Sequence, residues 1–276
     1  MLYHSNRKSK SVYQSPLGNA ARKQQQQLLS RLMAVGARDF LRTELTEKEG
    51  NGLHLNCGNG TLSLAIADLI GPERRLTGID SDAMMTEGAR IAAIEQGYRN
   101  VEFYTKKAFI PTIKPTFHFV FGRYLFSQLS SPQDKADQLY RLLHPNGLLL
   151  LEDLDLRRMN CFPYSYAFER FKELLRALYE LEGITNSTLG SNIKQQLQEA
   201  GFEQIRIKFQ TPLFLKNEFK QLASLSFESI MGGVMNKQLV SATEIHALLM
   251  ELKAFEQEEQ TMISLPGIYQ IKAYRL

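Results

Sequence analysis

A glycine turn between a short apolar segment and a helix-forming segment is the feature that most limits how this chain can fold. Residues 53–60 read Leu-His-Leu-Asn-Cys-Gly-Asn-Gly, and Asp80 lies twenty positions beyond Gly60, at the end of the run 76–80. A strand, a turn with two glycines, a helix and a second strand that ends in a carboxylate form the first half of a nucleotide-binding βαβ unit. The pattern therefore predicts an α/β fold built on a parallel sheet.

The residues of this turn have the chemistry that a nucleoside requires. Gly58 and Gly60 let the chain turn sharply and let a ligand approach the backbone, while the next helix presents free N–H groups. The Asp80 carboxylate can accept hydrogen bonds from two ribose hydroxyls. Its alternative role is to cap the following helix, although Ser81 and Asp82 can also do this. We interpret the turn as a site for an adenosine-containing cofactor.

Later motifs narrow the choice of cofactor. A dinucleotide site normally continues as G-x-G-x-x-G, whereas the third glycine is here Ser63, which disfavours a nicotinamide cofactor. The segment Leu143-His144-Pro145-Asn146-Gly147 precedes an apolar strand that ends in Glu152-Asp153. The chain closes with the run 263–274, which reads as a terminal strand.

In order and spacing, these motifs resemble the class I S-adenosylmethionine-dependent methyltransferases over roughly residues 20–276. The family pattern is a glycine-rich first turn, an acidic end to the second strand, an L-x-P-G-G turn before the fifth strand and a terminal antiparallel strand. The resemblance implies a Rossmann-like, seven-stranded, mostly parallel sheet with an antiparallel terminal strand, and S-adenosylmethionine as cofactor. The cofactor residues that it implies are Asn56, Gly58, Gly60, Asp80, Ser81, Lys107, Ala108, Phe109 and Arg123. For Arg123, a structural salt bridge is an equal alternative.

Four positions depart from the family pattern and support a second hypothesis, a methyltransferase-like binding or partner protein that does not catalyse. His54 and Asn56 stand where the family has an acidic residue and a glycine, and Lys107 and His118 stand where it often has aspartates. Asparagine tolerates the left-handed backbone conformation, so Asn56 can hold the turn. Its side chain is nevertheless expected to crowd the cofactor pocket.

The rest of the chain alternates strands and helices, as expected of a parallel sheet with helices on both faces. We predict strands near 52–56, 75–80, 100–104, 117–122, 147–152 and 205–209, and helices near 60–70, 83–97, 133–143 and 190–200. An amphipathic helix over 20–43, with Val35 on its apolar side, is expected at the sheet edge. Two insertions, 157–185 and 213–258, are not needed for the sheet, and the resemblance implies that they form a helical substrate cap, the second broken at Gly232-Gly233.

Residues 1–18 form a basic amino-terminal arm, and residues 19–276 are read as one methyltransferase-like domain. The first 38 residues hold seven of the 33 basic residues and none of the 29 acidic ones. The arm is either a solvated tail, a lid carrying Tyr3 and Tyr13, or a nucleic-acid contact. No recognised nucleic-acid-binding module accompanies it, so that partner is not expected.

The acceptor is expected to be a small molecule, because aromatic residues follow the fifth strand. Glu152, Asp153 and Asp155 would anchor it or supply a base, with a helix cap and solvated charges as the alternative. The aromatic residues could instead fill the core of the cap. The candidate substrate residues are Tyr13, Phe126, Asp153, Phe162 and Tyr164.

Methyl transfer from a sulfonium is an in-line displacement that depends mainly on alignment, so the sequence needs no catalytic triad, and no catalytic residue is predicted. The 276 residues contain no apolar run of about 20 residues and no signal core, which predicts a cytoplasmic protein without a membrane span. Cys57 and Cys161 lack metal-ligand spacing, and the histidines are scattered, so no metal is expected.

Overall fold

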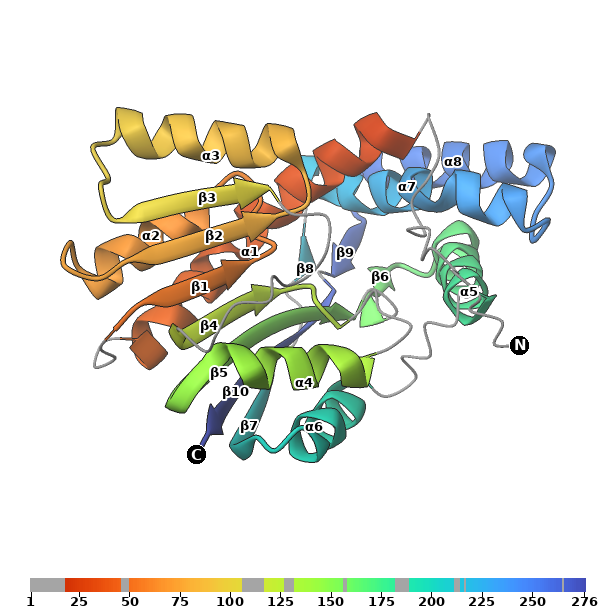
Figure 1. Cartoon of the computed structure of the whole chain (residues 1–276). Coiled ribbons are helices and arrows are strands. Elements are labelled where there is room, and N and C mark those ends of the chain that lie inside the picture. Colours follow the sequence, from red (N-terminus) through yellow and green to blue (C-terminus); the bar gives the residue numbers. More distant parts are fainter. Residues whose placement is uncertain are drawn as a thin grey trace, which may run out of the picture. The chain divides into compact units, whose positions relative to one another are not determined.

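A seven-stranded sheet in the order β3-β2-β1-β4-β5-β10-β7 organises one of two compact units into which this computed structural model divides (Figure 1). This sheet unit comprises Met33–Asp155, Asn186–Thr211 and Pro266–Leu276, and the helical unit comprises Met1–Leu32, Leu156–Thr185 and Pro212–Leu265. The structure describes residues 18–45, 50–105, 117–126, 132–155, 158–181, 189–210, 214–215, 217–264 and 266–276.

The strands of the large sheet are β1 Gly52–Leu55, β2 Leu76–Asp80, β3 Val101–Thr105, β4 Phe117–Arg123, β5 Leu143–Asp155, β7 Glu203–Gln210 and β10 Gly267–Arg275. The helices of the sheet unit are α2 Thr61–Ile70, α3 Ala83–Glu95, α4 Pro132–Leu142 and α6 Leu189–Glu199, and α1 Gly18–Leu45 contributes residues to both units. The helical unit contains α5 Tyr166–Leu181, the 3₁₀ helix Asn217–Gln221, α7 Leu222–Asn236, α8 Ala242–Gln257 and the short strands β6 Cys161–Phe162, β8 Phe214–Leu215 and β9 Met262–Ser264.

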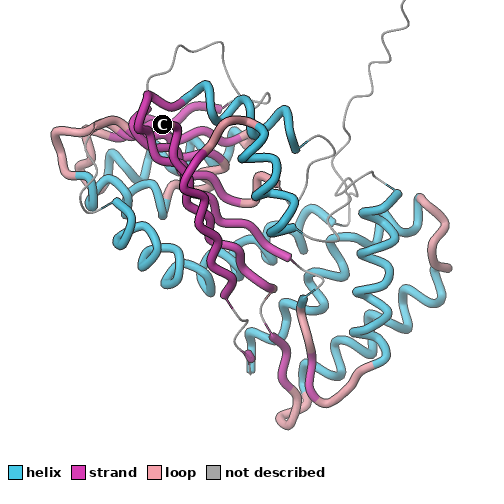
Figure 2. Tube along the Cα trace, turned by 90° about the horizontal axis from the view of Figure 1, so that it is seen from below, coloured by secondary structure: helices cyan, strands magenta, loops and turns pink. Residues whose placement is uncertain are grey.

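The pairing of the strands confirms the predicted fold class. Strands β1 to β5 pair with one another in parallel, whereas β10 is antiparallel to both of its neighbours, β5 and β7. Viewed from below, the strands of this sheet lie side by side with helices on either side of them (Figure 2). This is the architecture of the class I methyltransferase fold.

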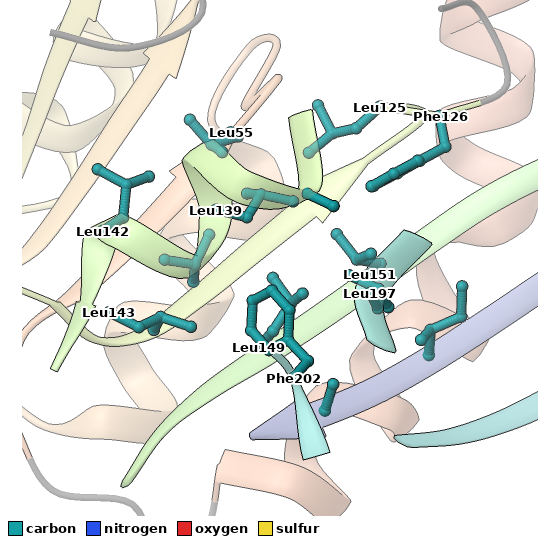
Figure 3. Packing of buried hydrophobic residues seen from close by; sticks show 14 of the residues in the cluster. Leu55, Leu125, Phe126, Leu139, Leu142, Leu143, Leu149, Leu151, Leu197 and Phe202 are labelled. Atoms are coloured by element: carbon teal, nitrogen blue, oxygen red, sulfur yellow. The ribbon is translucent and has the colours of Figure 1, made fainter. Parts of the chain in front are cut away.

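Alternation along the central strands divides the core between the two faces of the sheet, because successive side chains of a strand point in opposite directions. On β5, Leu149 and Leu151 pack with α4 and α6 in one cluster, which Figure 3 shows with Leu139 of α4 and Leu197 of α6. The intervening residues Leu148 and Leu150 belong to a second cluster on the opposite face, together with residues of α1 and α2. Both faces are therefore buried, as a parallel sheet requires.

Residues predicted to bound the helices do so in the structure. Gly71 ends α2 with its φ of 81°, and Gly201, with a φ of 96°, follows α6. The Asp82 carboxylate accepts hydrogen bonds from the N–H groups of Met84 and Met85 and so caps α3. Asp80 is thereby released from the capping role that was its alternative.

Several predictions of local structure were wrong. The second half of α1 packs on a face of the sheet rather than at its edge, because Ala37, Leu41 and Leu45 lie in the cluster with α2, and Val35 is exposed. Gly232 and Gly233 do not break a helix but lie inside α7. The final apolar run is split, since β9 belongs to a different sheet from β10.

The helical unit has a three-stranded sheet that the sequence did not predict. Strand β9 pairs antiparallel with β6 on one side and with β8 on the other. This sheet joins the two predicted insertions, since β6 belongs to the first and β8 to the second. Whether the insertions bind substrate stays a prediction, as do the predicted boundaries of the arm and the domain.

Among the helices that the structure describes, none combines the length and the apolar character needed to cross a membrane.

Candidate functional site

The turn between β1 and α2 brings three left-handed residues together at the carboxyl end of the sheet. The φ angles of Asn56, Gly58 and Gly60 are 55°, 55° and 79°. A Cβ atom on Gly60 would lie 2.7 Å from Cβ of Ala89 and 2.9 Å from Cζ of Phe103, so packing as well as conformation requires glycine there. A Cβ on Gly58 would meet no atom within 4 Å, which leaves open space over its backbone.

Both carboxylate oxygens of Asp80 accept hydrogen bonds from backbone N–H groups, one of them in this turn. Oδ2 accepts a hydrogen bond from the N–H of Gly58 at 2.8 Å, and Oδ1 accepts one from the N–H of Asp82 at 3.0 Å. Each carboxylate oxygen has two acceptor sites, so each can accept one more hydrogen bond. Asp80 is half-buried and Ser81 beside it is exposed. The carboxylate is therefore oriented and still able to bind a ligand.

On its other side, the turn is attached to β4 by Asn56. The Asn56 side-chain amide donates to the carbonyl oxygen of Arg123 at 3.0 Å. The next residue, Tyr124, also has a left-handed φ, 54°, and its N–H donates to the carbonyl of Glu152 at 2.8 Å. The Asn56 amide thus has its own partner on the neighbouring strand.

Arg123 forms the structural salt bridge that was one of its two expected roles. Its Nε donates to Oε2 of Glu152 at 2.9 Å, and the two residues are 6% and 1% exposed. Its Nη2 donates to the Tyr124 hydroxyl at 2.6 Å. The Gln270 amide donates to Oε1 of Glu152 at 3.1 Å, so Glu152 is bonded through both carboxylate oxygens. A contact of Arg123 with the cofactor stays a prediction.

The three acidic residues at the end of β5 are neither a helix cap nor solvated, which corrects that alternative. Glu152, Asp153 and Asp155 all lie within the strand and are buried. Because neighbours on a strand point to opposite faces, Glu152 and Asp153 do not form a carboxylate pair. Asp153 instead accepts a hydrogen bond from the N–H of Phe126 at 2.8 Å. Phe126 lies in the core cluster with α4 and α6 (Figure 3).

His54, where the resemblance implies an acidic residue, is buried and neutral. Its Nδ1 shares a hydrogen bond of 2.8 Å with Oγ of Ser63, and its Nε2 has no partner among the described residues. Burial and, to a smaller extent, the positive charge of Arg123 together lower the pKa of His54 to about 3. The imidazole therefore stays uncharged at neutral pH.

One prediction for the aromatic residues after β5 is that they fill the hydrophobic core of the cap, but most of them are exposed. Phe162, Tyr164 and Tyr166 are 59%, 74% and 57% exposed, whereas Phe168 is fully buried in the helical unit. Ser165, between Tyr164 and Tyr166, is buried, and its hydroxyl accepts a hydrogen bond from the N–H of Phe168 near the start of α5. The remaining predicted site residues, Tyr13, Lys107, Ala108 and Phe109, lie outside the described part of the chain.

Sequence reasoning missed two members of the site, Tyr124 and Gln270. Nothing in the local sequence marks either residue, because Tyr124 is defined by its left-handed backbone and Gln270 reaches Glu152 only through the pairing of β10 with β5. The register aligns Arg123 with Glu152 and Glu152 with Gln270. A row of hydrogen-bonded polar residues thus crosses neighbouring strands.

These residues fit an adenosine-containing cofactor. The open space over Gly58, the unused acceptor sites of Asp80 and the exposed Ser81 lie in sequence along the ends of β1 and β2. Gly60, the residue that precedes α2, has no side chain that could cap the helix, and the N–H of Thr61 donates to Oδ1 of Asn59 at 3.3 Å. In the ranges that the structure describes, no three His, Cys, Asp or Glu residues are arranged to hold a metal ion.

A concavity lies beside the turn, and its lining does not include Asp80. It has a volume of about 400 Å³, and its lining includes Arg38 of α1, Asp68 of α2 and Asn59 of the turn. Because Asn59 lies between Gly58 and Gly60 and lines this groove, the groove is next to the turn. We do not assign the cofactor to it.

Comparison with known proteins identifies the family. A family model described as "Methyltransferase domain" matches residues 46–223. Demethylmenaquinone methyltransferase of Listeria monocytogenes serotype 4a is 25% identical over 174 residues, which are 58% of this chain and 73% of that protein. The family match spans the glycine turn, Asp80, Arg123 and the end of β5.

Solved structures show the same fold. The YcgJ protein of Bacillus subtilis is similar with a TM-score of 0.57 and 18% identity, over 85% of this chain and 95% of that one. Phosphoethanolamine N-methyltransferase 2 of Haemonchus contortus, solved with phosphomonomethylethanolamine and S-adenosylhomocysteine, is similar with a TM-score of 0.51 and 15% identity, over 92% of this chain and 52% of that one. At these identities the likeness concerns the fold alone.

Proposed function

Because this chain belongs to the S-adenosylmethionine-dependent methyltransferases, as the family match over residues 46–223 shows, we propose that its β1–α2 turn and Asp80 bind the cofactor and that the acceptor is a small molecule. The proposed cofactor residues are those implied by the sequence. Within the described part of the chain they are Asn56, Gly58, Gly60, Asp80, Ser81 and Arg123.

The orientation of Asp80 is the observation that carries the proposal. Two backbone N–H groups, of Gly58 and Asp82, hold the carboxylate at the end of β2 without using all of its acceptor sites. Two ribose hydroxyls can then donate hydrogen bonds to a carboxylate that is already oriented, so little side-chain conformational entropy is lost when the cofactor binds. The exposed backbone of Gly58 allows close approach beside it.

The chemistry asks little of the protein beyond alignment. When bound, S-adenosylmethionine supplies a methyl group already activated on a sulfonium. The residues of the turn hold the donor so that an acceptor atom can approach in line, and such positioning can supply about 7 to 11 kcal/mol of the barrier reduction. Glu152 is not proposed as a base, because Arg123 and Gln270 already occupy its two oxygens.

An apolar or aromatic small molecule is the proposed acceptor class. Phe162 and Tyr164 are exposed aromatic side chains of the helical unit, and exposed aromatic groups often mark binding surfaces. The relative from Listeria monocytogenes carries demethylmenaquinone, an apolar quinone, in its name. Phe126, Asp153 and Tyr13 remain proposed acceptor contacts, and the cytoplasm remains the proposed location.

Isothermal titration of the protein with S-adenosylmethionine and with S-adenosylhomocysteine tests cofactor binding. We expect dissociation constants in the micromolar range and a rise in melting temperature on addition of either compound. If millimolar cofactor produced neither heat nor a thermal shift, cofactor binding by this chain would be disproved.

The acceptor class is tested by transfer of a radiolabelled methyl group. A reduced, short-chain demethylmenaquinone analogue should be labelled, and phosphoethanolamine should not be, because the two exposed residues proposed to contact the acceptor, Phe162 and Tyr164, are aromatic. Labelling of phosphoethanolamine alone would reverse the proposed preference. Labelling of added RNA alone would show that the acceptor is not a small molecule.

A further inference from the structure

Two neighbouring strands of the sheet unit end in non-glycine residues with left-handed backbones. Asn56 follows β1 and Tyr124 follows β4, with φ angles of 55° and 54°. The register pairs Leu55 with Gly122, so Asn56 lies next to Arg123 across the two strands. Such a conformation is uncommon outside glycine, and for a bulky residue such as tyrosine it is sparsely populated. It persists only where the surroundings fix it, and it often occurs at functional sites.

Hydrogen bonds on both sides of β4 fix these two residues. Asn56 donates from its side-chain amide to the Arg123 carbonyl at 3.0 Å, and Tyr124 donates from its N–H to the Glu152 carbonyl at 2.8 Å. The side chains of Arg123 and Glu152 are joined by the buried ion pair. The end of β4 is therefore bonded to β5 through both main chain and side chain.

The same row continues beyond β5 and gives Glu152 a second support. Gln270 donates to Oε1 of Glu152 at 3.1 Å and to the carbonyl of Gly36 at 3.2 Å, and it accepts from the amide of Gln210 at 2.9 Å. Glu152 and Gln270 are 1% and 2% exposed. In a buried setting such a connected network is stiff, because any broken member leaves an unpaired polar group.

We propose that Asn56, held by the Arg123 carbonyl, is a positioning residue that fixes the cofactor turn in its binding conformation, with Arg123 and Glu152 as its supports. This inference rests on the proposed function of the turn. The family pattern implies a glycine at this position, which would allow the conformation but would not enforce it. In this chain, the side chain both tolerates the left-handed backbone and attaches the turn to the rigid end of β4.

The substitution Asn56→Gly is therefore expected to weaken cofactor binding, whereas the family pattern alone predicts that it strengthens binding. If the asparagine crowded the cofactor, glycine would improve binding. If the asparagine anchors the turn, glycine removes one hydrogen bond and frees the backbone, and the dissociation constant should rise about 3- to 10-fold. Asn56→Asp keeps the tolerance for a left-handed backbone but removes the donor, so we expect a rise of similar size.

Asn146 provides a matched control in the same unit. It is also an asparagine with a left-handed φ, 62°, and it is exposed and lies in β5 on the amino-terminal side of the apolar run 148–151. Asn146→Gly therefore adds the same freedom to the unfolded chain without touching the cofactor turn. Comparing the two glycine variants separates loss of the anchor from a general effect of adding glycine.

The test is isothermal titration of the wild type, Asn56→Gly, Asn56→Asp and Asn146→Gly with S-adenosylhomocysteine, together with the melting temperature of each unliganded protein. We expect both Asn56 variants to bind about 3- to 10-fold more weakly and Asn146→Gly to bind as the wild type does. The melting temperature of Asn56→Gly should lie slightly below that of Asn146→Gly, because only the Asn56 variant loses the hydrogen bond to the Arg123 carbonyl. A wild type that binds while Asn56→Gly binds equally well or more tightly would overturn the positioning role. Retained affinity in Asn56→Asp would also overturn it, because that variant cannot donate to Arg123. Absence of binding by the wild type would instead contradict the proposed function.

Discussion

Two buried carboxylates, Glu152 of the sheet unit and Glu256 of the helical unit, are stabilised in different ways. In the sheet unit, the Arg123 guanidinium and the Glu152 carboxylate neutralise each other at 2.9 Å. In the helical unit, Glu256 is 7% exposed, and its carboxylate accepts from the N–H and the hydroxyl of a neutral residue, Ser224, at 2.7 and 2.9 Å. Burial raises the pKa of Glu256 to about 7. The buried carboxylate of the sheet unit is therefore paired with a cation, whereas that of the helical unit is held by neutral donors and titrates near pH 7.

The paired charges of the sheet unit suit the cofactor site that we propose there. A site for a charged ligand works best when its own charges do not move or titrate on binding. Asp80, Arg123 and Glu152 are each held by at least two hydrogen bonds from neighbouring strands or turns. The helical unit has instead exposed aromatic residues and a pH-sensitive core, which suit an adaptable surface better than a fixed one.

Glu152→Ala should give the largest effect, because it leaves the Arg123 cation buried without its counter-charge. Breaking a buried ion pair in this way typically costs about 3 to 5 kcal/mol of unfolding free energy. Urea denaturation followed by circular dichroism measures the loss. Glu228→Ala is the control, because the Glu228–Lys253 pair of the helical unit is far more exposed and should cost at most about 1 kcal/mol. Equal losses in the two variants would show that the fixed pair of the sheet unit is not special.

The next largest effect is expected for Gly60→Ala. The added Cβ would lie within 3.0 Å of Ala89 and Phe103, and the left-handed backbone adds strain, so we expect a loss of about 2 to 4 kcal/mol. Gly58→Ala introduces only the strain and should cost about 1 to 2 kcal/mol, because its Cβ meets no atom within 4 Å. Thermal denaturation of both variants ranks them, and a larger loss for Gly58→Ala would contradict the packing described for the turn.

The smallest expected effect is the dependence of stability on pH, which differs in sign between the two units. The folded state keeps a proton on Glu256 that the unfolded chain releases above pH 4.5, so the stabilisation is lost as the pH rises through about 7. His54 has the opposite sign. Its pKa is lowered from 6.5 to about 3, so its stabilisation is present above pH 6.5 and is lost as the pH falls toward 3.

Hydrogen exchange, corrected for the intrinsic pH dependence, can follow the two units separately. Between pH 5.5 and 8, we expect protection of α7 and α8 to fall by the equivalent of about 1 to 2 kcal/mol, and protection of β1 and β4 to hold or rise. Glu256→Gln should remove the trend in the helical unit, since glutamine does not titrate. A trend that persists in this variant would mean that another group is responsible.

The sequence predicted most of the sheet unit because its signals are local. The two glycines, the acidic end of β2 and the stop signals at Gly71 and Gly201 each act through the backbone within a few residues. The alternation of strand-like and helix-like segments then indicates a parallel sheet, and this placed most of its strands and helices along the sequence. Asp82 could likewise be read as a helix cap from its place before α3.

The remainder depends on contacts between distant segments, which a single sequence does not reveal. The predicted fifth strand ends near 152, so its acidic residues read as a cluster at the strand end. In the structure β5 continues to Asp155, and Glu152 and Asp153 point to opposite faces. The three-stranded sheet of the helical unit pairs segments roughly 50 to 100 residues apart, each with two or three residues, too short to show a period. The bond from Asn56 to the Arg123 carbonyl spans 67 positions.

The central claim is that Asp80, held beside the glycine turn, binds the ribose of the cofactor, and titration of Asp80→Ala with S-adenosylhomocysteine tests it most directly. Asp82→Ala is the matched control, because it removes a carboxylate two residues away that caps α3 and makes no proposed contact with the cofactor. We expect Asp80→Ala to weaken binding by about 2 to 4 kcal/mol, through loss of two charge-assisted hydrogen bonds, and Asp82→Ala to bind nearly as the wild type does. An affinity unchanged by Asp80→Ala, in a protein whose wild type binds the compound, would contradict the account.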